Sequence, residues 1–291
     1  MPLRAVAIAI CVGVLFGGNQ VASKIALQQF SPLFCAALAF TFSSMALGIY
    51  LGLYKKEQIL FSPHIWRLHI ISASLFFSFN LIALIGLNLT LASRASIFIA
   101  VHPFFVVLFN YFTAKKEQLS WQKLLGLCLI LIGVLIVFRD RFEPLLGASW
   151  IGDILIILAS ALLGLTILHI RTVTNYLSPF QATFWQISLC VPAFWVTAFI
   201  FESPLQLPLF SPSWWGIIYM GLLVNAIAFV IRAELFRRYN TNTVSVFLFI
   251  SPITGLFLSY FLLKEPITWT ITWGSILIIF GIFLVYYFTP L

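Results

Sequence analysis

The sequence predicts an all-α integral membrane protein with ten transmembrane helices in two inverted five-helix repeats. Three observations lead to this prediction. Of the 291 residues, 62% are hydrophobic and only 8% are charged, whereas soluble domains carry about 25% charged residues. Apolar runs of about 20 residues, long enough to cross a bilayer, recur along the chain. Finally, the first half of the chain shares motifs with the second.

The predicted spans fill nearly the whole chain. The longest connections, near 54–64 and 138–150, have the length of ordinary loops, so no separate catalytic or nucleic-acid-binding domain is expected. The net charge of +8 is therefore assigned to loop cations, and no nucleic-acid partner is predicted. The ten spans lie near residues 4–28, 33–54, 64–88, 91–114, 119–138, 150–173, 179–201, 212–236, 241–263 and 267–288.

Local sequence features support the first, second and seventh predicted spans. The run from Ala5 to Leu27 exceeds the core of a signal peptide and no small-residue cleavage site ends it, which favours a permanent span. The second and seventh spans each open at a Ser-Pro pair, Ser31-Pro32 and Ser178-Pro179. Proline is favoured in the first turn of a helix, so these pairs predict helix starts.

Lys and Arg residues predict the orientation in the membrane. With a cytoplasmic N-terminus, eleven cations fall on the cytoplasmic side and five on the other, and the Lys/Arg excess marks the cytoplasmic face. We therefore expect both termini in the cytoplasm, and the inner membrane if the source is bacterial. The first group is Arg4, Lys55, Lys56, Arg67, Lys115, Lys116, Lys123, Arg171, Arg232, Arg237 and Arg238; the second is Lys24, Arg94, Arg139, Arg141 and Lys264.

The fourth and fifth spans resemble the ninth and tenth. "SRASIFIAVHP" (93–103) lines up with "NTVSVFLFISP" (242–252), and "KEQLSWQKLLG" (116–126) lines up with "KEPITWTITWG" (264–274). The alignment continues to Gly133 and Gly281. Chance does not readily produce such anchors in the same order, so the sequence predicts an internal repeat.

The two halves also begin alike, with Lys24 at the place of Arg171. Each half holds five spans, an odd number, so the second half enters the membrane upside down relative to the first. Inverted repeats are typical of secondary transporters, which hold substrate near the bilayer midplane. The repeats are predicted to occupy residues 1–145 and 146–291.

The segment "FGGNQVASK" (16–24) resembles the first-helix motif of the EamA-type transporters, a family of the drug/metabolite transporter superfamily. Gly17, Asn19 and Lys24 match that motif, whereas Phe16 replaces its Trp. Ala39 stands where the family often places an Arg. The resemblance implies a ten-helix permease, in most members an exporter of amino acids and related metabolites. It also implies a central cavity lined largely by helices 1, 3, 4, 6, 8 and 9.

Asn19, Gln20, Ser23 and Lys24 share one face of the first predicted helix, within an arc of roughly 140° at about 100° per residue. Lipid offers no hydrogen-bond partner to an amide, so this face is expected to look inward. Asn19, Gln20 and Ser23 are predicted to contact substrate, with bonding between helices as the alternative. Lys24 is expected to snorkel to the outer interface.

His102 precedes Pro103 deep in the fourth span, where proline frees a backbone carbonyl. Both a packed, hydrogen-bonded histidine and a functional ionisable group fit this position. Its repeat counterpart is Ser251. We expect gating through the two prolines of the fourth and ninth spans, Pro103 and Pro252. The other predicted substrate contacts are Asn80, Trp185, Gln186 and Asn225.

Acidic residues are scarce, and none is expected deep within a span, which disfavours cationic substrates. No motif for hydrolysis or nucleotide binding is present, so neither an enzyme nor an ATP-driven pump is predicted. We expect no cofactor and no metal site. The predicted partners are the lipid bilayer and a small-molecule substrate, with proton or ion coupling and a monomeric or homodimeric state left open. A lipid-handling or assembly protein of the same architecture is the alternative function.

Overall fold

The computed structural model describes residues 1–55, 62–112, 121–139, 149–202, 211–239, 244 and 247–287. All regular secondary structure in these ranges is helical, which agrees with the predicted all-α class. In chain order the helices are α1 (Leu3–Ala26), α2 (Pro32–Tyr50), the π-helix η1 (Leu51–Lys55), α3 (Pro63–Leu89), α4 (Ala92–Ile99), α5 (His102–Phe112), α6 (Trp121–Arg139), α7 (Trp150–Val173), α8 (Pro179–Ser188), α9 (Cys190–Phe201), α10 (Ser213–Ile218), the π-helix η4 (Tyr219–Ala228), α11 (Phe229–Arg238), α13 (Ile250–Leu263) and α14 (Trp269–Tyr287).

Eight helical runs within the described residues are long and apolar enough to cross a membrane, and they coincide with the first eight predicted spans. At the ninth and tenth predicted spans lie two shorter apolar helices, Ile250–Leu263 and Trp269–Val285. Residues 241 and 288, where those predicted spans begin and end, fall outside the described residues, as does the predicted boundary between the repeats at 145/146. The count of ten helices therefore stays a prediction.

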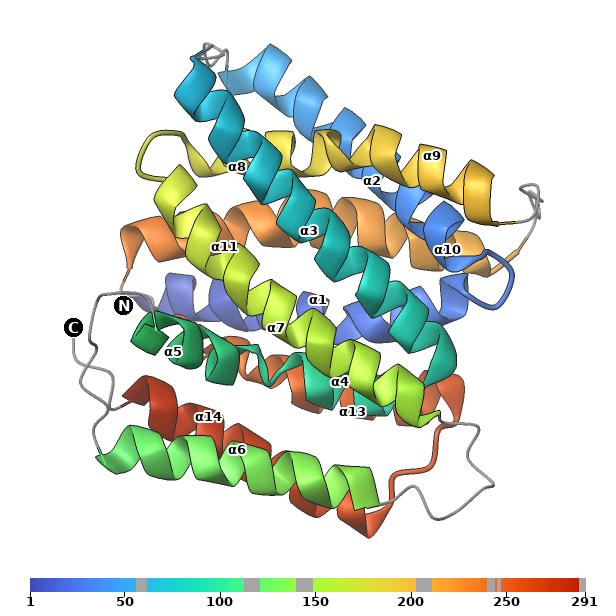
Figure 1. Ribbon diagram of the computed structural model, residues 1–291, viewed down its shortest axis with the longest axis vertical. Helices are drawn as coiled ribbons and strands as arrows, with labels where there is room; N and C mark the ends of the chain where they lie inside the picture. The colour runs from blue at the N-terminus through green and yellow to red at the C-terminus, as the bar shows by residue number, and fades with distance from the viewer. Residues whose placement is uncertain are drawn as a thin grey trace.

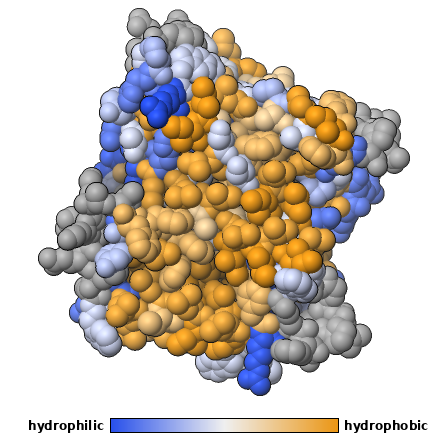
Figure 2. All heavy atoms as spheres, in the orientation of Figure 1, coloured by the Kyte–Doolittle hydropathy of each residue, from blue (hydrophilic) through white to orange (hydrophobic). Residues whose placement is uncertain are grey.

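The molecular surface is suited to lipid. Trp121, Phe201 and Trp269 are 73%, 76% and 79% exposed, which would be unfavourable for large apolar side chains in water. Figure 2 shows hydrophobic residues covering most of the visible face, with hydrophilic ones gathered toward its edges. The chain is therefore a multi-pass membrane protein.

Helices from distant parts of the chain pack side by side (Figure 1). Helices α6 and α14 form one edge of the molecule, α2 and α9 the opposite edge, and α1, α3, α7 and α13 lie between them. The start of α1 and the end of α14 lie on the same side. Glycines allow the close approach of α6 and α14, since a Cβ added to Gly126 would lie 2.6 Å from the carbonyl oxygen of Gly281.

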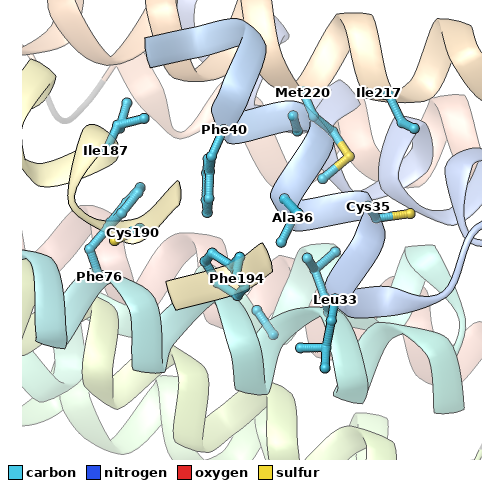
Figure 3. Close-up of a cluster of buried hydrophobic side chains, with 14 of the residues drawn as sticks. Leu33, Cys35, Ala36, Phe40, Phe76, Ile187, Cys190, Phe194, Ile217 and Met220 are labelled. Atoms are coloured by element: carbon cyan, nitrogen blue, oxygen red, sulfur yellow. The ribbon is translucent and has the colours of Figure 1, made fainter. Parts of the chain in front are cut away.

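An apolar core fills the space between α2, α3, α8–α9 and α10–η4 (Figure 3). The ring of Phe40 lies 5.6 Å from that of Phe76 and 5.2 Å from that of Phe194. At the start of α2 the Glu202 carboxylate accepts hydrogen bonds from the backbone amides of Leu33 and Phe34, at 2.8 and 3.0 Å. This carboxylate satisfies donors that the helix itself leaves unpaired.

A helix break lies at the centre of the molecule, where α4 ends at Ile99 and α5 begins at His102. The break precedes Pro103, which has no N–H for the carbonyl of Ile99. That oxygen instead accepts hydrogen bonds from His102 Nδ1 at 3.0 Å and from Ser160 Oγ at 3.3 Å. His102 therefore makes a hydrogen bond at the break, which fits one of the two roles considered for it.

Candidate functional site

A central cavity of about 140 Å³ lies beside this break. Its walls come from α1, α3, the α4–α5 break, α7, η4–α11 and the residues around the start of α13. These are the six spans that the family resemblance implied. Most of the lining is apolar, as is usual for small-molecule sites. The uncharged polar residues in the wall are Asn19, Gln20, Asn80, His102, Asn225 and Ser251.

Most amide side chains in the cavity wall form no hydrogen bond with other described residues. Asn80 Nδ2 donates to the carbonyl oxygen of Phe76 in its own helix, at 2.8 Å. Within the described part of the chain, the side chains of Asn19, Gln20 and Asn225 make no hydrogen bond. A buried amide without a partner costs free energy. These side chains are therefore arranged for water or a ligand, and they do not bond one helix to another.

Asn225 owes its position to an irregular helix. It belongs to the π-helix η4, which runs from Tyr219 to Ala228. A π-helix is wider than an α-helix and frequently marks functional sites, because it redirects side chains within one helix. Tyr219 Oη donates to the carbonyl oxygen of Leu15 at 3.0 Å and holds η4 against α1. This contact brings Asn225 into the same wall as Asn19 and Gln20.

The two predicted gating prolines differ in their relation to the cavity. Pro252 lines it, together with Ser251, whereas Pro103 is buried next to His102 in the chain and is not part of the lining. The cavity therefore joins both proline-bearing spans at their irregular points.

Three predicted substrate contacts lie outside the central cavity. Ser23 is buried, and its Oγ donates to the carbonyl oxygen of Asn19 at 2.7 Å, because a helical serine can reach back one turn. The Trp185 ring packs on Trp66 and His69, with centroids 5.1 and 5.7 Å apart. Gln186 Nε2 donates to Ser72 Oγ at 3.0 Å and lines an adjoining hollow.

Arg171 and Arg232 are cavity residues that were not among the predicted contacts. The Arg232 guanidinium lies over the rings of Phe16 and Phe229, 5.1 and 4.5 Å from their centroids. Both arginines fall inside predicted spans, 150–173 and 212–236. A charge within a span is by default a functional candidate, and that signal would have identified them had they not been counted only toward orientation.

The cavity continues toward one end of the molecule. Arg171, Phe229 and Arg232 also line the adjoining hollow, which reaches Asn175 and Arg237 near the C-terminal ends of α7 and α11. The end of α11 carries two ion pairs, since the Glu234 carboxylate accepts hydrogen bonds from Arg237 and Arg238.

The opposite end of the molecule is closed by polar contacts. Lys24 Nζ donates to the carbonyl oxygens of Leu87 at 2.7 Å and Thr90 at 2.6 Å, at the C-terminal end of α3. Lys24 therefore reaches the end of α3 and does not line the central cavity. The ammonium satisfies carbonyls that have no partner within α3 and interacts favourably with the negative end of the helix dipole.

Two acids are buried at this closed end, and both lie at helix ends, as expected, and not deep within a span. Asp153 and Arg94 are 1% and 2% exposed, and Arg94 Nη2 lies 2.6 Å from Asp153 Oδ2. Glu265 accepts from the first two backbone amides of α4, those of Ala92 and Ser93, both at 2.8 Å. Each carboxylate is compensated by donors, so neither is available to hold a cationic substrate in the cavity.

Comparison with known proteins places the chain among transporters. The model of the EamA-like transporter family matches residues 3–139 and 150–287. The Bacillus subtilis protein named Uncharacterized transporter YoaV is 22% identical, over 94% of each chain. An Escherichia coli protein named Probable amino-acid metabolite efflux pump is 22% identical, over 95% of this chain and 93% of its own. A solved crystal structure shares the fold, with a TM-score of 0.71 over 99% of this chain and 98% of its own, at 16% identity.

Proposed function

Because this chain belongs to the EamA-like transporter family, we propose that it is a secondary transporter that exports amino acids or related small metabolites. The observation that carries the proposal is the central cavity, where the amides of Asn19, Gln20 and Asn225 face space without a protein partner. Transporters hold substrate in such a polar site between membrane-spanning helices. The name of the Escherichia coli relative supports metabolite export.

We attribute transport to alternating access between inverted repeats at 1–145 and 146–291. Contacts between α6 and α14 support this division. Gly126 meets Gly281, and Gly133 meets Gly274. In the sequence alignment Gly126 corresponds to Gly274 and Gly133 to Gly281, so a two-fold axis would exchange the two contacts. Such crossed contacts are expected where two equivalent helices pack on their symmetry axis.

Two residues at equivalent positions of the repeats have different surroundings, and this difference also supports alternating access. Lys24 is bonded to the end of α3 at the closed end, whereas Arg171, its repeat counterpart, lines the hollow at the other end. In an inverted repeat, exchanging the conformations of the two halves opens one end and closes the other. With cytoplasmic termini the open end faces the cytoplasm, where an exporter takes up its substrate.

We place the hinges of this exchange at Pro103 and Pro252. Pro103 follows the break between α4 and α5, whose freed Ile99 carbonyl is held by two side chains, those of His102 and Ser160. Residues at helix breaks absorb backbone rotation more readily than residues within a continuous hydrogen-bonded helix. Both prolines adjoin the cavity wall, so movement there would reach the substrate directly.

The first test compares cells that express the wild type with cells that express Asn19→Leu/Gln20→Leu. Metabolites inside and outside the cells are profiled by mass spectrometry after a metabolite load, with membrane levels of each protein matched. Gln28→Leu/Gln29→Leu is the control, because these exposed amides follow α1 outside the cavity. We expect a small set of metabolites to leave faster with the wild type and the control than with the cavity variant. Equal pools in all three strains would contradict the proposal.

Lipid handling is a second candidate, favoured by one observation. An apolar groove between α1, α13 and α14 includes Ile10, Ile253 and Phe280, and it shares Phe249 with the central cavity. An acyl chain fits such a groove, whereas a polar metabolite does not. Unchanged metabolite pools together with an altered lipid composition in the wild-type strain would favour this function over metabolite export.

A further inference from the structure

We propose that Arg171 closes the open end of the molecule in a second conformation, by donating hydrogen bonds to the carbonyl oxygens at the C-terminal end of α11. The inference rests on the proposed transport function, because alternating access requires a conformation in which this end is closed and the other end is open. It adds the residue that stabilises that conformation and the backbone groups to which this residue binds.

The closed end of the molecule shows the type of contact that we infer. Lys24 Nζ donates to the carbonyl oxygens of Leu87, Asn88 and Thr90, at 2.7, 3.3 and 2.6 Å. The last carbonyls of a helix have no N–H partner within it, and a cation there also interacts favourably with the negative end of the helix dipole. One side chain near the end of α1 thereby holds the end of α3 against α1.

Arg171 occupies the same place in α7 that Lys24 occupies in α1. Each cation lies two residues before the last residue of its helix. The residues that follow the helices also share one conformation, with φ and ψ of −65° and −9° in Leu27 and of −71° and −7° in Thr174. The two cationic side chains therefore start from the same local backbone geometry.

The end of α11 matches the end of α3 equally closely. When the alignment of the fourth and ninth predicted spans is extended toward the N-terminus, Leu87 falls on Phe236 and Thr90 falls on Tyr239. Thr90 directly follows α3 and Tyr239 directly follows α11, and both are extended, with φ of −133° and −128°. The carbonyl oxygens of Phe236 and Tyr239 are thus the counterparts of two that Lys24 binds.

In the present conformation the guanidinium of Arg171 is available for such a contact. Arg171 is exposed, and within the described residues its side chain makes no hydrogen bond and no ion pair. Arg171 and Phe236 line the same adjoining hollow of about 360 Å³, one from α7 and the other from α11. No Asp or Glu is among the described residues of this lining. A guanidinium enclosed there would therefore meet oxygens of uncharged groups, such as those at the end of α11.

The chemistry of a guanidinium suits a helix end. The group carries five N–H donors and no acceptor, so it can bond more than one carbonyl oxygen at once. The methylene groups of an arginine can pack on an apolar wall while its charge reaches a polar group, and Phe229 and Phe236 provide such a wall in the hollow. An arginine can therefore do at the end of α11 what a lysine does at the end of α3.

The two contacts belong to different stages of the proposed cycle. In an inverted repeat, the two halves exchange conformations when the open end changes sides. The Lys24 contact stabilises the conformation described above, and the Arg171 contact stabilises the other one. Removing the Lys24 side chain should therefore favour the second conformation, whereas removing the Arg171 side chain should disfavour it.

The test follows the two conformations through the rate at which an engineered cysteine reacts with a maleimide. Purified full-length protein in lipid nanodiscs is used, with the four native cysteines replaced by serine. Ser93→Cys is the reporter at the closed end, where Ser93 is buried, and Ala233→Cys is the reporter in the hollow at the open end. A buried cysteine reacts only in conformations that expose it, so its rate follows their population.

Variants of the two cations give the main comparison. A charge-assisted hydrogen bond is worth about 10- to 100-fold in an equilibrium, so Lys24→Met should raise the labelling rate at position 93 about tenfold or more. Adding Arg171→Met to Lys24→Met should lower that rate again by about tenfold or more, whereas adding Arg171→Lys should not. Arg238→Gln, added in the same way, is the control and should leave the rate unchanged, because it removes a 65% exposed charge from the same end.

Three results would overturn the inference. If adding Arg171→Met leaves the rate at position 93 unchanged or raises it, Arg171 does not stabilise the second conformation. If Lys24→Met alone labels as slowly as the wild type, a cation at a helix end does not control the closed end. Faster labelling of Lys24→Met at both positions 93 and 233 would indicate a general loosening of the protein, because a shift between the two conformations raises the rate at one position only.

Export measurements separate this inference from the transport function. Labelling needs no substrate, so if the wild type releases no metabolite beyond the vector control, the export function fails and labelling still decides on Arg171. If the wild type releases metabolites and Arg171→Met releases them at the same rate, transport stands and the role of Arg171 is refuted. We expect Arg171→Met to lower release about tenfold, because the cycle passes through the second conformation, while Arg238→Gln matches the wild type.

Discussion

Replacing Asp153 by Asn should strongly destabilise the closed end of the protein. The Asp153 carboxylate accepts from Arg94 Nε at 3.1–3.2 Å, from Arg94 Nη2 at 2.6 Å and from Thr90 Oγ1 at 2.6 Å. These contacts join the start of α4 to the start of α7 and the end of α3. Asparagine keeps the size of the side chain, but it removes the negative charge and turns an N–H group toward the donors of Arg94.

The size of the expected loss of stability follows from the burial of the ion pair between Arg94 and Asp153. Both partners are almost fully buried, at 2% and 1% exposure, and removing one partner of a buried ion pair costs about 3–5 kcal/mol because the other charge is left uncompensated. Such a loss changes the folding equilibrium by about 100-fold or more. The ion pairs of Glu234 give an internal comparison. Their arginines are 56% and 65% exposed, so Glu234→Gln should cost no more than about 1 kcal/mol.

The assay is equilibrium unfolding of purified protein in mixed micelles, titrated with sodium dodecyl sulfate. The double variant Arg94→Met/Asp153→Leu should recover most of the loss, since an apolar pair of similar volume can replace a buried ion pair. If Asp153→Asn loses no more stability than Glu234→Gln, burial does not control the contribution of this pair and the reasoning is refuted. A double variant as unstable as Asp153→Asn would show that packing, and not charge, was lost.

Three further predictions concern packing, helix ends and gating. Gly126→Ala should lower the free energy of unfolding by about 1–3 kcal/mol in the same assay, because the new Cβ would press on the backbone of α14. Gly52→Ala is the control and should not lower it, because no atom lies within 4 Å of the new Cβ. Glu265→Ala should cost about 0.5–2 kcal/mol, as for a lost helix cap, because two buried amides of α4 lose their acceptor; an unchanged midpoint would contradict this. Pro103→Ala/Pro252→Ala should slow metabolite release at normal membrane levels, and an unchanged rate would refute gating through these prolines.

Local chemistry made much of the fold predictable. The Ser-Pro pairs 31–32 and 178–179 do open α2 and α8, with proline in the first turn. Pro103 predicted a freed carbonyl with a polar neighbour, and His102 is that neighbour. The polar face of the first helix predicted inward amides. In each case the signal lies within a few residues of sequence, where backbone geometry alone fixes which groups meet.

Contacts between distant residues could not be predicted in the same way. Asp153 and Arg94 are 59 positions apart, and Glu265 reaches α4 across 173 positions. Nothing in either local sequence distinguishes an acid beside a loop from one that a neighbouring helix buries. Trp185 gives a second example. It was predicted as a substrate contact together with Gln186, and the structure adds ring contacts with Trp66 and His69 of α3 that the local sequence does not indicate.

The count of cations used to predict the orientation included residues at the membrane surface and residues inside the protein. Leaving out the residues inside the protein does not change the predicted orientation. Arg171 and Arg232 line the cavity and Lys123 is 1% exposed, so three of the eleven cations on the cytoplasmic side do not face solvent at the membrane surface. On the opposite side Lys24 and Arg94 serve helix contacts within the protein, which removes two of five. Eight cations against three keep the same direction of bias. The cations removed from the count are those that lie within the protein, and a charge inside a membrane protein is by default a functional candidate.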